Sequence, residues 1–322
     1  MERAATDLRA PDAGSGTVRV LRILLGASLF AAVLVATVRE WQDVSDTVAE
    51  IGPSAILLSL SLTLLGLAAS AITWKCSLYE LGASVTTPSA MKIYLVGQLG
   101  KYIPGSVWAL VVQMELARSA GVRRVQSLSA GVLAVGINVL TGGALGLAVQ
   151  PFIGEGSTFR WVAGVVGIAL CAVALAPPVL GRLADFAVRI ARQPRLDCAP
   201  SWPGVARAAS FSVASWLLYG LALSILAVGA GAETSATLLV ALPAVALAMT
   251  VGFLVVISPS GIGVREAVLV AALAPVLPPS TALAVALVLR VVFTLADLLA
   301  AAATLPIRIS RVREPSSVGA RA

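Results

Sequence analysis

A chain of 322 residues with 58% hydrophobic and only 12% charged residues is too apolar for a soluble globular domain, in which about 25% of residues are charged. It contains no histidine and only three cysteines, which are far apart in the sequence, so we expect neither a metal site nor a bound cofactor. The formal net charge of +7 is compatible with nucleic-acid binding, but the basic residues are distributed as in a membrane protein, so no nucleic-acid partner is expected.

Long apolar segments recur along the chain. A helix needs about 20 apolar residues to cross a hydrocarbon core about 30 Å thick. Five segments of about this length or longer contain no Asp, Glu, Lys or Arg, and they lack the alternation of a β-barrel strand. The pattern predicts an all-α, polytopic integral membrane bundle. The five segments are residues 51–74, 125–154, 161–181, 208–232 and 234–264.

The N-terminal region divides into a polar and an apolar segment. Residues 1–17 are expected to be disordered, and residues 18–38 to form the first span. A cleaved signal peptide is the alternative for this region, but residues 36–38, with the sequence ATV, are a poor cleavage site. An acidic external loop is expected at 39–50, followed by a second span at about 53–74.

The basic residues indicate on which side of the membrane each loop lies. With the N-terminus in the cytoplasm, five cytoplasmic segments hold 18 of the 23 Lys and Arg residues, whereas the external loops hold two, beside six acidic residues. This bias follows the positive-inside rule. We therefore expect a multi-pass protein of the plasma membrane with both termini in the cytoplasm. The five cytoplasmic segments are residues 1–22, 75–92, 118–124, 178–207 and 308–322.

Residues 89–121 do not have the pattern of a simple span. Lys101 and the Pro104-Gly105 pair lie in the middle and leave apolar halves of about ten residues, each about 15 Å long as a helix. Such halves are too short to cross the hydrocarbon core. Because basic residues flank the segment on both sides, we expect a re-entrant hairpin that enters from the cytoplasm, turns at the Pro-Gly pair and leaves on the same side.

A second helix break lies at residues 258–263, where one proline and two glycines occur within five residues. A short helix follows to about residue 276, and residues 281–306 form the last span. With both termini inside, the number of crossings is even, so the short helix is expected to cross as a thin or broken span. The total is then about eight spans. The predicted organisation is a cytoplasmic segment 1–17, one transmembrane domain 18–306 and a basic tail 307–322.

Each break places the N-terminus of a helix inside or at the edge of the membrane, with unpaired N–H groups and a partial positive charge. A base lies close to each, Lys101 at the first and Arg265 at the second. Broken helices of this kind bind anionic groups in transporters, so the pattern favours a site for a phosphate-bearing lipid headgroup. The alternative is structural, with a lysine that snorkels beside an interfacial turn and an arginine in an ion pair.

Four charged residues lie within the apolar C-terminal region: Arg265, Glu266, Arg290 and Asp297. Charges at the centre of a span cost at least roughly 2.5–3.5 kcal/mol each, so they pair or face a cavity. We expect Arg265 to pair with Asp297 and Arg290 with Glu266, so that Arg265→Gln destabilises the fold and Lys101→Gln does not. A neutral network that only locks the short helix to the last span is the alternative.

Two motifs together resemble a known family. Residues 100–108, GKYIPGSVW, and residues 258–266, SPSGIGVRE, look like the two main motifs of the lysylphosphatidylglycerol synthase membrane domain, whose members are also called flippase-like proteins. The order and spacing match over about residues 20–306, and Arg290 with a later acid in the last helix also fits. Ser260 stands where the family often has glycine. The resemblance implies a helical membrane unit that moves a lipid across the bilayer.

Multidomain members of this family carry a soluble aminoacyl transferase domain, whereas only residues 307–322 follow the last span here. We therefore predict a stand-alone flippase or translocator of an anionic phospholipid or polyprenyl-phosphate-linked lipid, and not an enzyme. The alternatives are a membrane glycosyltransferase that uses polyprenyl-phosphate sugars, and a non-catalytic partner of a cell-envelope glycosyltransferase or lipid synthase. The residues expected to contact the headgroup are Lys101, Tyr102, Pro104, Gly105, Trp108, Gly261, Gly263 and Arg265.

Overall fold

The computed structural model describes five ranges of the chain together with Val35, and every secondary-structure element in them is helical. The expected all-α membrane bundle is therefore confirmed. Apart from Val35, the predicted segment 1–17 and the predicted first span 18–38 lie outside the described residues. The five described ranges are 41–102, 108–149, 158–190, 198–254 and 263–311.

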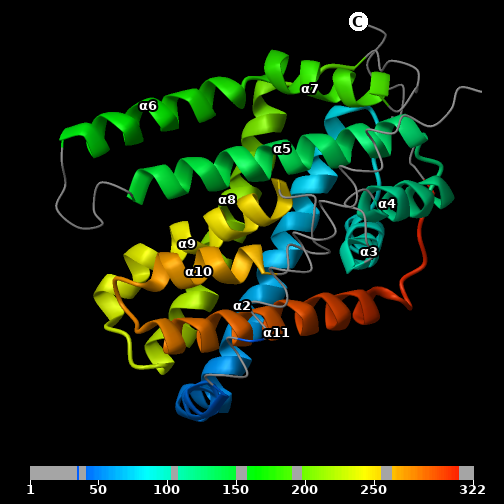
Figure 1. Ribbon diagram of the computed structural model, residues 1–322. Helices are drawn as coiled ribbons and strands as arrows, with labels where there is room; N and C mark the ends of the chain where they lie inside the picture. Colours follow the sequence, from blue (N-terminus) through cyan, green and yellow to red (C-terminus); the bar gives the residue numbers. More distant parts are fainter. Residues whose placement is uncertain are drawn as a thin grey trace, which may run out of the picture.

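Ten α-helices and one short 3-10 helix make up the described part of the chain (Figure 1). In chain order they are α2 (Trp41–Glu80), α3 (Thr87–Gln98), η1 (Leu99–Tyr102), α4 (Trp108–Ser119), α5 (Arg124–Val149), α6 (Thr158–Ala174), α7 (Pro177–Ile190), α8 (Trp202–Gly229), α9 (Thr234–Leu254), α10 (Val264–Leu273) and α11 (Pro279–Thr304).

Five of these helices are long and apolar enough to cross a membrane, namely α2, α5, α8, α9 and α11. The pair α6 and α7 is a sixth candidate if it counts as one broken span, because the two helices meet at an angle of 64°. α10 has 10 residues and is about 15 Å long, half the thickness of the hydrocarbon core. The described residues thus hold five or six candidate spans of the eight expected for the whole chain.

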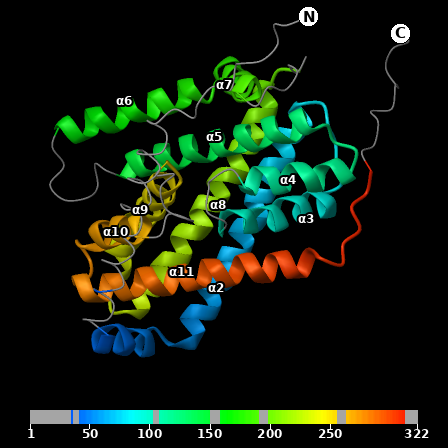
Figure 2. The same ribbon diagram turned by 45° about the vertical axis from the view of Figure 1, so that its right-hand side comes forward.

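The acidic segment expected as an external loop is helical from Trp41 onward. The chain turns within α2 at Gly52, whose φ of 70° and ψ of 160° are not helical, and Pro53 follows. Glycine adopts this positive φ without the steric cost that a side chain would add. The turns before Gly52 consequently point away from the long, membrane-length part of α2 (Figure 2).

The region 178–207, expected as a cytoplasmic loop, contains helix α7. One face of α7, formed by Leu180, Ala184 and Val188, is buried. Leu180 and Ala184 share a hydrophobic cluster with Leu133 and Ile137 of α5. The expected span at 161–181 is therefore divided between two helices, and α7 packs across α5 where a loop was expected.

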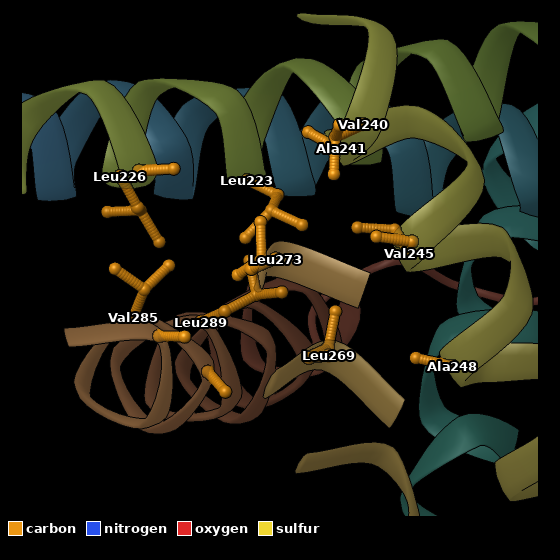
Figure 3. Packing of buried hydrophobic residues seen from close by; sticks show 14 of the residues in the cluster. Leu223, Leu226, Val240, Ala241, Val245, Ala248, Leu269, Leu273, Val285 and Leu289 are labelled. Atoms are coloured by element: carbon orange, nitrogen blue, oxygen red, sulfur yellow. The ribbon is translucent and has the colours of Figure 1, made fainter. Parts of the chain in front are cut away.

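Helices α8, α9, α10 and α11 enclose one large hydrophobic cluster (Figure 3). Its fully buried members include Leu223 and Leu226 of α8, Val245 of α9, Leu273 of α10 and Leu289 of α11. Such interdigitated side chains fix the rotation of each helix. Packing on both sides holds the short helix α10, and with it the residues at its N-terminus, in a defined position against α11.

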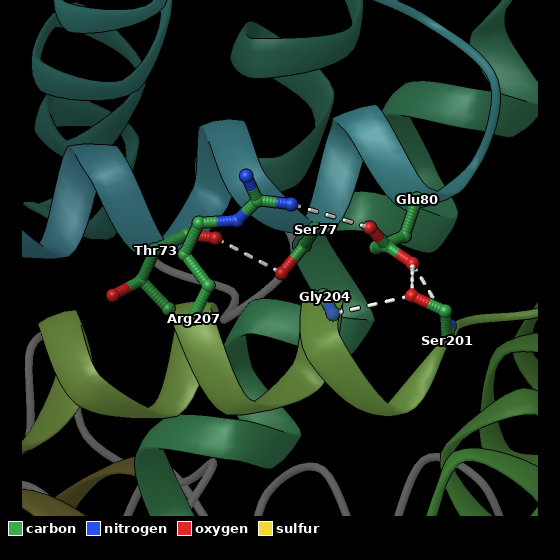
Figure 4. A network of polar contacts seen from close by, with 6 residues as sticks. All are labelled: Thr73, Ser77, Glu80, Ser201, Gly204 and Arg207. Carbon is green, nitrogen blue, oxygen red and sulfur yellow. Dashed lines mark hydrogen bonds and ion pairs between the residues drawn. The ribbon is translucent and has the colours of Figure 1, made fainter.

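The C-terminal end of α2 is tied to the N-terminal end of α8 (Figure 4). The Glu80 carboxylate accepts hydrogen bonds from the backbone N–H of Ser201 at 2.8 Å and from its hydroxyl at 2.6 Å, and Arg207 lies 3.8 Å away. The Ser201 hydroxyl in turn accepts from the N–H of Gly204 at 3.1 Å. Acceptors at a helix N-terminus satisfy its free N–H groups and complement its dipole, so this contact caps α8.

Further contacts hold α3 against the chain that follows α11. Lys92 Nζ donates to the backbone carbonyls of Leu305 at 2.6 Å and Ile307 at 2.8 Å. The N–H of Ser310 donates to Ser89 Oγ at 3.0 Å. A lysine at this position satisfies carbonyls that are left unpaired at the end of a helix. The hairpin that begins with α3 is thereby anchored beside α11.

Candidate functional site

Helices α3 and α4, with η1 between them, form the first broken element. Each helix has 12 residues, about 18 Å of length, and the two lie side by side (Figure 2). A Cβ on Gly100 would lie 2.7 Å from the backbone of both Trp108 and Ala109, so the two arms touch at the level of the backbone. Neither arm is long enough to cross the core. The expected turn at Pro104 and Gly105 lies outside the described residues.

The end of η1 brings two side chains to α11. Lys101 Nζ lies 2.6 Å from Oδ2 of Asp297, and the Tyr102 hydroxyl donates a 2.6 Å hydrogen bond to the same oxygen. The Asp297 side chain is 1% exposed, whereas that of Lys101 is 24% exposed. The other carboxylate oxygen of Asp297, Oδ1, is buried and has no hydrogen-bond partner among the described residues. One carboxylate oxygen thus receives both donors, and the second is free to accept another.

The second break separates α9 from α10, and its residues 255–262, Gly261 among them, lie outside the described residues. α10 begins after Gly263, whose φ is 87°. The Glu266 carboxylate accepts a 2.7 Å hydrogen bond from the Gly263 N–H and forms an ion pair with Arg290 of α11. The Gly263 N–H is therefore satisfied within the protein by a capping contact. The expected contact of Gly263 with a headgroup stays a prediction.

Helix α11 contacts both broken elements and gives each of them one charge. Asp297 pairs with a base of the first break, and Arg290 pairs with an acid of the second. These two residues are seven positions apart, about 10.5 Å along the same face of the helix. α11 also packs against both α3 and α10 (Figure 1). Two breaks that are far apart in the sequence therefore meet on one helix through reciprocal ion pairs.

We call Lys101, Arg265, Glu266, Arg290 and Asp297 the charge cluster. Arg265 is its remaining base. Within the described part of the chain, no carboxylate lies at ion-pair distance from its guanidinium, and its Nε is buried without a hydrogen-bond partner. Its side chain packs so closely on α9 that a Cβ on Gly252 would lie 2.5 Å from Cγ. Asp297 and Tyr102 nevertheless lie within electrostatic range of the guanidinium. The base of the second break thus lies in the electrostatic field of residues at the first, without contacting them.

The expected pair of Arg290 and Glu266 is present, but Asp297 pairs with Lys101 and not with Arg265. Adjacent residues on a helix point about 100° apart. Glu266 faces α11, so Arg265 is turned toward α9 and leaves Asp297 to the lysine of η1. The spacing on the last helix indicates a common face for Arg290 and Asp297, but it does not indicate which base from another segment reaches the aspartate.

Comparison with protein families agrees with this arrangement. The family model that describes the lysylphosphatidylglycerol synthase TM region matches residues 20–301. The chain belongs to this family. A comparison with curated protein sequences gave no match. The matched region contains both broken elements and α11 up to residue 301, so the charge cluster lies within the membrane unit of the lysylphosphatidylglycerol synthase family. The protein is therefore a multi-pass membrane protein of lipid-related processes.

Aromatic residues lie at the first break and near Asp297. Trp108, expected to contact a headgroup, is the first residue of α4, and its side chain is 43% exposed. Two tyrosines that the sequence did not single out, Tyr94 of α3 and Tyr219 of α8, lie within electrostatic range of Asp297. Nothing in the sequence marks them, because a single tyrosine in an apolar helix is typical of ordinary packing.

The charge cluster contains one more basic residue than acidic residues. The two segments at the breaks that lie outside the described residues, 103–107 and 255–262, contain no acidic residue. A net charge taken out of water is costly unless a counter-charge accompanies it, so the arrangement suits the binding of one anionic group. The three bases and two acids of the cluster are Lys101, Arg265, Arg290, Glu266 and Asp297.

Proposed function

We propose that this member of the lysylphosphatidylglycerol synthase TM family is a lipid translocator that binds an anionic, phosphate-bearing lipid at the charge cluster. The observation that supports this most directly is Arg265, whose buried Nε has no partner among the described residues while the neighbouring charges are paired. A lipid phosphate supplies the missing anion. A guanidinium binds a phosphate through two parallel N–H donors, and the acyl or prenyl chains of the lipid stay in the bilayer.

In this proposal the protein moves the lipid without changing its covalent structure. Irregular backbone at membrane depth is tolerated where it is buried in protein or lines a cavity, and described elements that flank both breaks contact α11. A shift of α11 relative to the breaks would expose the bound headgroup to one side or the other. We further propose a location in the plasma membrane with both termini in the cytoplasm, and a cell-envelope glycosyltransferase or lipid synthase as the source of the lipid.

The variant Arg265→Gln tests the central base. It removes the guanidinium and leaves no described carboxylate without its ion-pair partner, so the fold is retained. We expect the dissociation constant for phosphatidylglycerol to rise about ten- to a hundredfold, because a hydrogen bond to a charged group contributes roughly 1.5–3 kcal/mol. Native mass spectrometry of the purified protein in detergent measures the bound lipid. The matched control is Arg123→Gln, at an exposed arginine, which should bind like the wild type.

The double variant Lys101→Gln with Asp297→Asn tests the second base. Replacing both partners by neutral amides of similar shape avoids the unpaired carboxylate that Lys101→Gln alone would leave. We expect weaker binding of phosphatidylglycerol, with most of the thermal stability retained. If this variant and Arg265→Gln both bind the lipid as tightly as the wild type, the cluster is only a structural lock between the breaks and α11, and the proposed function is wrong.

A further inference from the structure

Helix α7 carries two different surfaces on the side that faces away from α5. One is an apolar strip with Phe186 and Ile190, whose side chains are 62% and 69% exposed. The other is a charged strip with Arg182 and Arg189, which are both exposed. At 100° per residue the two strips lie about a quarter of a turn apart. The remaining members are Val179 and Leu183 in the apolar strip and Asp185 in the charged strip.

Two close approaches show how the strips are turned relative to the bundle. A Cβ on Gly181 would lie 3.6 Å from Cδ of Pro200, just before α8 begins. A Cβ on Gly136 would lie 3.2 Å from Leu183 Cδ2, and Gly136 is about 18 Å along α5 from Arg124, its first residue. Gly181 and Leu183 point about 200° apart, because they are two residues apart on a helix. The charged strip is therefore turned toward the end of the bundle where α5 and α8 begin, and the apolar strip toward its middle.

The composition of the chain changes between α6 and α7. α6 has one charged residue in 17, Arg160 in its first turn, and it exposes apolar side chains such as Val165 and Leu170, as a helix in contact with acyl chains does. α7 has three charged residues in 14 and leaves the line of α6 at an angle of 64° (Figure 2). Because exposed charges are costly in the hydrocarbon core, α7 is not suited to continue the path of α6 across it.

We propose that α7 lies in the plane of the headgroup layer, at the end of the bundle where α5 and α8 begin, and that its partner is the anionic lipid surface there. Helices of this kind bury an apolar face about 5–10 Å deep and keep their charged face at the headgroups. The apolar strip then contacts acyl chains, and Arg182 and Arg189 meet lipid phosphates. The charged strip has one more base than acid, which favours anionic over neutral lipid. This proposal uses no residue of the charge cluster and does not rest on the proposed function.

A protein partner is the alternative occupant of the apolar strip. A stable protein interface takes about 20–30 residues on each side, whereas the strip has four. The contact with α5 bounds it on one side and the charged strip on the other, so it does not widen into a larger apolar face. Arginines along its outer border match the charge of lipid phosphates. The small width and the basic border both favour the lipid surface.

Nitroxide labels test the depth of α7. In a background with the three cysteines replaced by serine, Phe186→Cys and Arg189→Cys are labelled in lipid nanodiscs. The label at 186 should collide mainly with oxygen, which dissolves in hydrocarbon, and the label at 189 mainly with a water-soluble nickel chelate. The matched control, Val165→Cys at an exposed position of α6, should report hydrocarbon. A label at 189 that behaves like the one at 165 would place α7 within a span. A label at 186 shielded from both reagents would show a protein partner. Either result overturns the proposal.

The choice of neighbouring lipid tests the charged strip. A bimane attached at Phe186→Cys is quenched by phosphatidylglycerol or by phosphatidylcholine that carries a nitroxide near the headgroup. We expect phosphatidylglycerol to be enriched about fivefold at low salt, as one net basic residue at the surface predicts, and the enrichment to fall as salt is added. Arg182→Gln with Arg189→Gln should lose this preference. The control Arg123→Gln, at an exposed arginine before α5, should keep it. Equal quenching by the two lipids without these substitutions, or a preference that survives the double substitution, overturns the proposal and leaves the proposed function untouched.

Discussion

At the scale of single residues, Lys101 has a larger structural role than Arg265. Lys101 holds the Asp297 carboxylate, whereas Arg265 holds no carboxylate in the described part of the chain. We predict that Lys101→Gln lowers the free energy of unfolding by about 3–5 kcal/mol, the cost of breaking a buried ion pair at one partner. Arg265→Gln should cost clearly less. Thermal unfolding of both variants in the same detergent measures the difference.

The second substitution Asp297→Asn should restore most of the stability lost in Lys101→Gln, because it removes the uncompensated charge. Equal stability of Lys101→Gln and Arg265→Gln would contradict the assigned pairing. The prediction reverses the order expected from the sequence, which assigned Asp297 to Arg265. Sequence spacing correctly indicated that Arg290 and Asp297 share a face and that Arg290 pairs with Glu266. The choice between two bases depends on the direction of η1, and no periodicity encodes that direction.

At the scale of secondary-structure elements, the cap between α2 and α8 requires Gly204. A Cβ at this position would lie 1.8 Å from Cδ of Glu80, so the carboxylate has to leave the N-terminus of α8. We predict that Gly204→Ala destabilises the protein by about 1–2 kcal/mol through the lost capping hydrogen bonds. The thermal unfolding midpoint in detergent reports the loss. Gly143→Ala is a suitable control, because its Cβ would meet only Cys171 Sγ, at an ordinary 3.7 Å.

A double-mutant cycle separates the cap from the helix propensity of alanine. In a Glu80→Ala background the clash is absent, so Gly204→Ala should be neutral or should stabilise α8 by up to about 1 kcal/mol. The same destabilisation in both backgrounds would show that Glu80 is not the group displaced. Because Ser201, which holds Glu80, is 121 residues away in the sequence, this contact could not be inferred from local sequence.

The elements themselves were predictable where length and polarity decide, and not where the chain changes direction. The charge-free run 161–181 reads as one span, yet α6 ends at Ala174 and α7 starts at Pro177 at an angle of 64°. Hydropathy measures how much apolar surface a segment carries, but it does not measure whether the helix continues straight. The same limit applies at Gly52. The residues before it were expected to be a loop, but they are helical, and the direction changes at Gly52, the one residue there with a positive φ.

At the scale of the whole molecule, segments expected in the cytoplasm meet at one end of the bundle. Gln126 of α5 donates to the carbonyl of Leu81 after α2 at 3.0 Å. Glu80 caps α8 through Ser201, and Lys92 binds the chain after α11. These contacts join the ends of α2 and α11, the beginnings of α5 and α8, and the middle of α3, as expected if the basic segments share one side of the membrane.

The opposite end of the bundle contains the segment expected outside. Ile51 of α2 packs against the last residue of α8, where a Cβ on Gly229 would lie 3.3 Å from the backbone of Ile51. The acidic turns of α2 precede this contact, and Ser45 within them is exposed. The segment before this contact is acidic, whereas several segments at the other end of the bundle are basic, and the proposed orientation rests on this difference.

This arrangement predicts opposite accessibility for two exposed serines. In a background with Cys76, Cys171 and Cys198 replaced by serine, Ser45→Cys should react with a membrane-impermeant maleimide in intact cells, because it lies at the acidic end. Ser310→Cys should react only after permeabilisation, because Ser310 lies in the chain after α11, where its backbone N–H donates to Ser89 of α3. The two changes are chemically identical, so any difference reports sidedness. Labelling of Ser310→Cys alone in intact cells would invert the proposed orientation, and labelling of both would show that α2 does not separate the two ends.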